Sequence, residues 1–87
     1  MSGLPWIKVD VDLPEHPKSV RLGGLLGTPL AWGHVVALWA WCARYAPDGE
    51  LHGDDASALV ETGARWVGRP GRFVDAATKA GFLEPIP

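Results

Sequence analysis

The most constraining feature of this sequence is an apolar stretch over residues 30–45, which reads LAWGHVVALWAWCARY. Within it only Gly33, His34 and Arg44 fall outside the apolar set. A helix that is apolar on every side is normally buried. The stretch therefore predicts a central helix that the rest of the chain surrounds, with the tryptophans and His34 in the core.

The ends of this predicted helix carry recognisable signals. Thr28 can cap its N-terminus, Pro29 suits its first turn, and Pro47 followed by Asp48 and Gly49 prevents its continuation. The stretch is shorter than a membrane-spanning helix and contains charged or polar side chains, so we expect no membrane association.

The composition is that of an ordinary globular protein. The chain has 87 residues, 47% of them hydrophobic and 21% charged, which predicts a single domain over residues 1–87. The single cysteine, Cys42, excludes an internal disulfide and favours a reducing compartment. Because the N-terminal residues do not resemble a secretory signal, we expect a cytoplasmic protein.

Hydrophobic periodicity and turn residues predict the remaining elements. Alternating Ile7, Val9 and Val11 indicate a strand, and Gly27 and Gly81 are typical helix C-caps. Gly23 and Gly24 suggest close packing of their helix against the tryptophan-rich one. The predicted order is a strand at 6–12, helices at 17–26 and 30–45, at most a very short strand near 51, helices at 54–62 and 71–80, and a strand at 82–86.

This order is that of a winged helix-turn-helix. The predicted fold class is mainly α with a small β-sheet: four helices, an N-terminal strand and a truncated wing. The strand at 6–12 is expected to pair with the strand at 82–86 or to cover the edge of the sheet. The helix at 71–80 takes the position of the recognition helix.

Motifs in the same order resemble a known family. They are Trp6-Ile7-Lys8, His16-Pro17-Lys18, Leu38-Trp39 followed by Trp41, Pro47-Asp48-Gly49 with Leu51, Trp66 with Gly68, Phe73, and Gly81-Phe82-Leu83. Together they resemble the N-terminal domain of phage and prophage replisome organisers, which are DnaD-like replication initiation proteins. The resemblance covers nearly the whole chain. It implies a winged-helix module that binds origin DNA or helps to assemble initiation proteins in the cytoplasm or nucleoid of a bacterial host. Such a module is either the N-terminal domain of a longer protein or a small stand-alone relative.

Basic residues cluster locally although the formal net charge is −2. A phosphate-binding surface needs such a local cluster rather than a positive total. Arg69 or Arg72 is placed to contact guanine in the major groove. An ordinary solvated face, with Asp75 paired to Arg72 or Lys79, is the alternative. The predicted residues for binding double-stranded DNA are Arg65, Arg69, Arg72, Thr78 and Lys79, with flanking contacts from Lys18 and Arg21.

Two other functions remain open. The acidic segment at 48–61 favours a module for self-association or for binding other replication proteins, with Trp6 and Trp66 as contact residues. A small transcriptional regulator is the second alternative. Trp66 either stacks on an unpaired base or braces the turn between the two short helices, whereas Trp32, Trp39 and Trp41 are expected in the core.

No credible catalytic set, metal site or cofactor motif is found. The acidic run from Asp48 begins like a calcium loop, but Leu59 stands where a bidentate Glu is required. His16, His34 and His52 lack ligand spacing, and Cys42 lies among apolar side chains. We therefore expect a protein that is not an enzyme.

Overall fold

The computed structural model describes residues 7–84, and these residues contain helices but no strand. The helices are α1 (Pro17–Leu26), α2 (Trp32–Tyr45), α3 (Ala56–Gly63) and α4 (Arg72–Ala80), preceded by one 3₁₀ turn at Leu13–Glu15. The predicted number and order of the helices are therefore confirmed. The predicted sheet is wrong.

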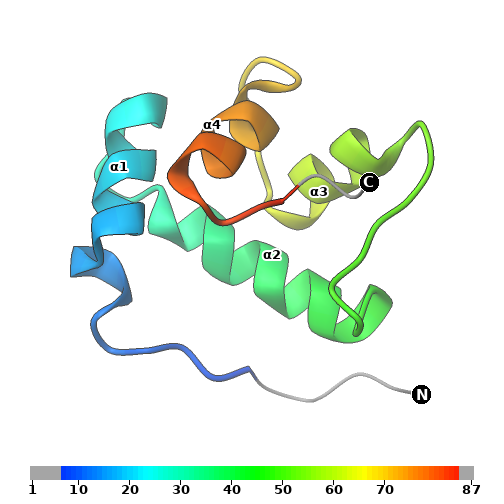
Figure 1. Ribbon diagram of the computed structural model, residues 1–87, viewed down its shortest axis with the longest axis horizontal. Coiled ribbons are helices and arrows are strands. Elements are labelled where there is room, and N and C mark those ends of the chain that lie inside the picture. Colours follow the sequence, from blue (N-terminus) through cyan, green and yellow to red (C-terminus); the bar gives the residue numbers. More distant parts are fainter. Residues whose placement is uncertain (1–6, 85–87) are drawn as a thin grey trace.

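The helices pack in two layers. The longest helix, α2, crosses the molecule, while α1, α4 and α3 lie along one side of it (Figure 1). Within this second layer α4 packs against both α1 and α3. Phe73 on α4, Leu22 on α1 and Val35 on α2 are the largest fully buried side chains, so the core lies where α4 meets the other helices.

Several helix ends follow the local signals in the sequence. Helix α1 has the predicted bounds, and its cap Gly27 adopts the left-handed conformation with φ 74°. Gly81 closes α4 in the same way with φ 94°. Helix α2 begins later than predicted because the hydroxyl of Thr28 accepts a hydrogen bond from the amide of Leu30, at 3.3 Å, and forms a turn before the helix.

The predicted N-terminal strand is absent from residues 7–12. Asp10 explains why: its carboxylate accepts the amide of Asp12 at 2.8 Å, and its carbonyl accepts the amide of Leu13 at 3.0 Å. These bonds turn the chain into the 3₁₀ segment instead of leaving its amides free for a neighbouring strand. Val11 is 91% exposed, so the apolar alternation does not correspond to a buried sheet face. Residue 6 lies outside the described residues.

The predicted wing is also absent from the described part of its range, residues 82–84. The amides of Phe82 and Leu83 donate to the carbonyl of Ala77, at 2.9 and 3.4 Å, and complete the C-terminal cap of α4. The side chains of both residues pack against the helical core. The segment near Leu51 forms no strand either. This part of the chain therefore extends the helical packing, and the winged-helix fold class is incorrect.

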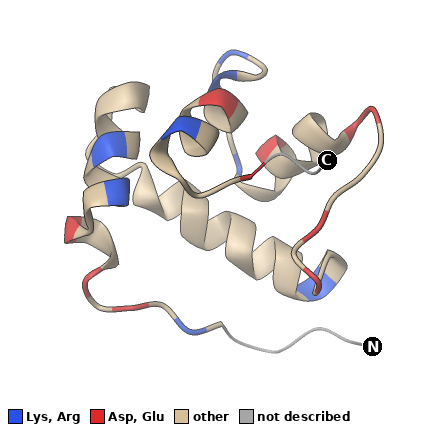
Figure 2. Ribbon diagram, viewed as in Figure 1, with Lys and Arg blue, Asp and Glu red and all other residues tan. Residues whose placement is uncertain are grey.

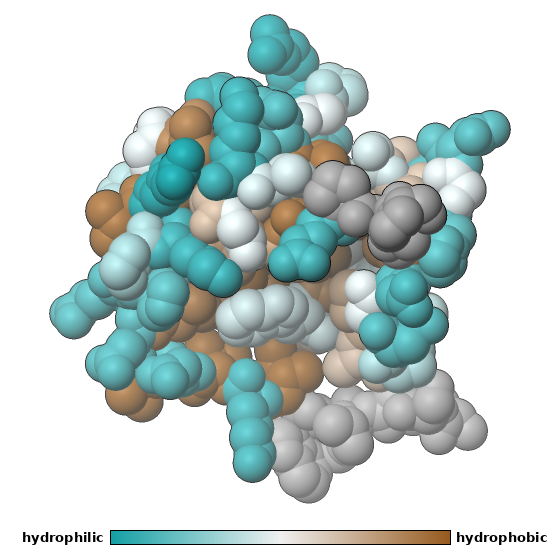
Figure 3. All heavy atoms as spheres, in the orientation of Figure 1, coloured by the Kyte–Doolittle hydropathy of each residue, from teal (hydrophilic) through white to brown (hydrophobic). Residues whose placement is uncertain are grey.

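The central helix is less buried than its sequence predicts. Only Val35 and Leu38 of α2 are buried, while Trp39 is 37% and Tyr45 63% exposed. Because the other helices cover one side of α2, its other side has no helix against it in the part of the chain described. Apolar side chains are visible between hydrophilic ones on the face of the molecule shown in Figure 3. The prediction that Trp39 lies in the core is wrong.

The two glycines of α1 have different surroundings. A Cβ on Gly23 would lie 2.8 Å from the carbonyl oxygen of Thr28, so this glycine permits close packing against the turn before α2. A Cβ on Gly24 would meet nothing within 4 Å. The expectation of close packing therefore holds for Gly23, although the neighbour is the turn and not the tryptophan-rich helix.

Candidate nucleic-acid interface

The carboxylate of Glu61 on α3 holds the beginning of α4. One oxygen accepts the amide of Gly71 at 2.8 Å, and the other accepts the amides of Phe73 at 3.0 Å and Val74 at 3.2 Å. Glu61 is only 8% exposed, and α4 has no cap from its own preceding side chain. Three amides that a helix N-terminus would leave free are thus bound by one carboxylate, whose charge also suits the positive end of the helix.

The segment between α3 and α4, residues 64–71, folds around Trp66, and we call it the connector. The indole nitrogen of Trp66 donates to the carbonyl of Arg69 at 2.9 Å. The ring lies over Gly68, where a Cβ would come within 2.3 Å of it. Of the two roles considered for Trp66, the structure therefore shows the bracing role.

His34 ties α2 to the connector. Its Nδ1 lies 2.7 Å from the carbonyl oxygen of Ala64, and its ring meets those of Trp66 and Phe73 edge-on, at centroid distances of 5.4 and 5.8 Å. His34 is only partly buried, so its predicted place in the core is met in part. Through this contact the connector is anchored to the central helix as well as to α3.

The connector is longer than the roughly three to four residues of a helix-turn-helix turn. Its first part closes α3: the amide of Trp66 donates to the carbonyl of Glu61 at 2.9 Å, and Arg65 takes a left-handed conformation with φ 58°. Glycine is the usual residue at such a position, since a side chain there costs about 1 kcal/mol. Arg65 therefore carries a charged side chain at a backbone conformation that is unfavourable for any residue other than glycine.

The predicted DNA-binding basic residues lie on adjoining elements. Most of the lysines and arginines lie on α1, α4 and the connector, whereas acids are concentrated in the N-terminal segment and in the loop between α2 and α3 (Figure 2). We call this set of basic residues, which lie on α1, on α4 and on the connector between α3 and α4, the basic face. Its members, six of the eight Lys and Arg residues and all exposed, are Lys18, Arg21, Arg65, Arg69, Arg72 and Lys79.

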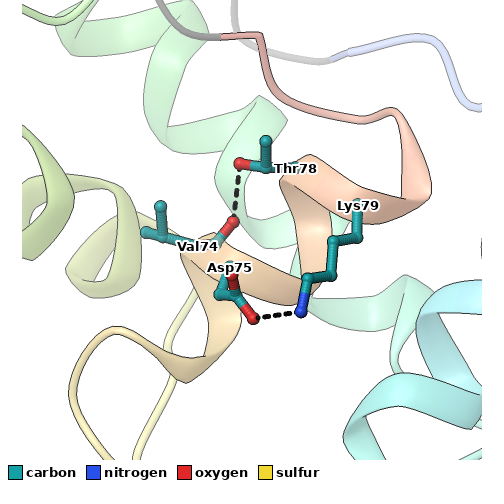
Figure 4. Close-up of polar contacts among 4 residues, drawn as sticks. All are labelled: Val74, Asp75, Thr78 and Lys79. Atoms are coloured by element: carbon teal, nitrogen blue, oxygen red, sulfur yellow. Dashed lines mark hydrogen bonds and ion pairs between the residues drawn. The ribbon is translucent and has the colours of Figure 1, made fainter.

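Both lysines of the basic face have intramolecular partners. Lys79 pairs with Asp75 at 3.1 Å, as the alternative of a solvated face predicts (Figure 4). Lys18 donates to the carbonyl of Gly81 at 3.2 Å and so links α1 to the C-terminal end of α4. The four arginines, by contrast, have no carboxylate within 4.0 Å among residues 7–84.

Thr78 lies apart from this surface. Its hydroxyl donates to the carbonyl of Val74 at 2.7 Å, and its side chain leaves α4 in a different direction from that of Lys79 (Figure 4). Thr78 and Val74 line a groove beside α3. Thr78 is thus the one predicted site residue that the fold separates from the basic face.

Cys42 does not have the surroundings of a nucleophile. It is partly buried on α2, and desolvation raises the pKa of its thiol above the ordinary value. A thiol in such surroundings is less ionised at neutral pH than a free one.

Glu61 is the important residue that sequence reasoning did not single out. In the sequence it is one more acid of the acidic segment. Its amide partners lie on the following helix, beyond the reach of the local capping patterns that a sequence reveals. Only the crossing of α3 and α4 brings them together.

No family model, curated protein or solved structure matches this chain. Within residues 7–84, none of the helices is both long and apolar enough to cross a membrane.

Proposed function

We propose that this protein binds double-stranded DNA through the basic face, with the arginines as the main phosphate contacts. The observation that carries the proposal is that four arginines on elements that pack together are exposed and have no acidic partner among residues 7–84: Arg21, Arg65, Arg69 and Arg72. Guanidinium groups bind phosphate oxygens in a bidentate manner and are well suited to this task.

The capping of α4 constrains how such a complex forms. Amides at a helix N-terminus often bind phosphate, but here the amides of Gly71, Phe73 and Val74 donate to Glu61. Phosphate contacts therefore depend on side chains. Arg69 and Arg72 lie on either side of the α4 N-terminus, and in this proposal they contact the backbone or a guanine edge.

Replication initiation is the process to which the resemblance to phage replisome organisers points, and that part of the proposal rests on the resemblance alone. A transcriptional regulator would use the same basic face. The two functions differ in their target. Depletion of an initiation protein would block replication from its origin, whereas depletion of a transcriptional regulator would change transcription from the promoter that it binds.

A fluorescence anisotropy titration of a random-sequence duplex at several salt concentrations tests DNA binding. Reversing two arginines (Arg69→Glu with Arg72→Glu) is expected to weaken binding strongly at low salt and to lower the slope of log K against log salt by about two units. The matched control, Lys8→Glu with Arg44→Glu, makes the same charge change outside the basic face. Absence of binding at low salt, or equal slopes for the two double variants, would refute the proposal.

A further inference from the structure

A second surface, distinct from the basic face, is a groove of about 890 Å³ bounded by α2, the loop between α2 and α3, α3 itself, α4 and the residues that follow α4. Its floor is mainly apolar. The side chains that form it come from the three helices and from the residues after α4, and are Leu38, Cys42, Val60, Val74, Phe82 and Leu83.

The rim of the groove is acidic. Glu50 and Glu84 line it and are exposed, while no Lys or Arg is among the described residues that line it. Asp48, Asp54 and Asp55, also exposed, belong to the same loop as Glu50. The groove thus combines an apolar floor with a negative rim, on a protein whose positive charges lie mainly elsewhere (Figure 2).

We propose that this groove binds an amphipathic helix of a partner protein, with an apolar stripe that fills the floor and basic side chains that meet Glu50 and Glu84. A helix in a groove is a common mode of peptide recognition, and charge complementarity selects the partner. The groove presents no strand edge among residues 7–84, so an added β-strand has nothing to pair with there. This inference does not depend on DNA binding.

Cys42 provides a local reporter, because it lies in the floor of the groove. The probe is a synthetic helical peptide of about 15 residues, with leucines every three or four positions and lysines between them. Binding is measured by calorimetry at low salt, and the alkylation rate of Cys42 by iodoacetamide is measured with and without the peptide. When about 90% of the chains are bound, alkylation is expected to slow about tenfold.

Charge variants test the rim. Glu50→Lys with Glu84→Lys is expected to weaken peptide binding about tenfold, whereas Asp12→Lys with Glu15→Lys, which makes the same charge change away from the groove, leaves it within twofold. A peptide of the same composition without the leucine stripe should neither bind tightly nor protect Cys42. Equal effects of the two double variants, or binding that leaves the alkylation rate unchanged, would overturn the proposal.

Other occupants would give different results. If a second copy of the chain fills the groove, light scattering will show a dimer, and Cys42 will become more reactive on dilution. If the chain's own end fills it, Ile86→Ser will accelerate alkylation without any peptide, and the unmodified protein will not bind the probe. Either result would replace the proposed partner helix.

Discussion

Glu61 on α3 and Phe73 on α4 are joined by a hydrogen bond of 3.0 Å from the buried amide of Phe73 to the carboxylate. Phe73 is also fully buried in the core, so the residue that packs α4 against the other helices is the one whose backbone Glu61 holds. The position of the basic residues on α4 and the connector depends on this contact.

Replacing Glu61 should therefore destabilise the protein far more than replacing an exposed acid. Glu61→Ala leaves three amide donors without their acceptor, one of them buried, and is expected to lower the free energy of unfolding by about 3 kcal/mol. Glu61→Gln should cost less, because one oxygen remains. Urea denaturation measures both, with Glu15→Ala as the exposed control. A loss for Glu61→Ala no larger than that of the control would contradict the capping role.

The connector should be sensitive at Gly68. In Gly68→Ala the new methyl group would overlap the ring of Trp66, and we expect a loss of about 1 to 3 kcal/mol together with a change in tryptophan fluorescence. Gly24→Ala is the matched control: its methyl group meets no atom within 4 Å, so it should raise helix stability by about 0.5 to 1 kcal/mol. Similar stabilities for the two variants would mean that Trp66 does not pack over Gly68.

The native Asp75 is expected to lower the affinity of the basic face for DNA, so its replacement should raise that affinity. In Asp75→Asn the ion pair with Lys79 is lost, which frees one positive charge and removes the exposed negative charge of α4. Affinity for duplex DNA at low salt is expected to rise severalfold, with stability lowered by only about 0.5 kcal/mol because the pair is exposed. Anisotropy titrations of Asp75→Asn measure this gain. The control is Glu50→Gln, which removes an equal charge from the rim of the groove. An equal gain in both variants would indicate a general charge effect.

The alkylation of Cys42 should depend on pH in a way that reflects its burial. Because desolvation raises the pKa of the folded thiol, alkylation at neutral pH should be slower than in urea-unfolded protein, and the rise in rate should occur at higher pH. The same shift affects the free energy of unfolding. The contribution of Cys42 to that free energy is constant below the ordinary pKa of a thiol, and it falls as the pH rises from there through the pKa of the folded state. Coincident rate profiles for folded and unfolded protein would contradict this.

The helices were predictable because their signals are local. Pro17 and Gly27 bound α1, and Gly81 ends α4, through backbone preferences that operate within a few residues. The basic residues of the connector and α4 were recognisable for the same reason. The sheet was not, because alternation at residues 7–11 describes an extended segment only where a partner strand exists, and residues 82–84 instead cap a helix.

Local pattern thus specifies where this chain forms helices and which residues carry its charge. The exposure of Trp39, the separation of Thr78 from the basic face and the capping of α4 by Glu61 depend on tertiary packing. Each involves elements distant in sequence, and whether an apolar side chain is covered or a buried amide finds its acceptor is settled only when the helices cross.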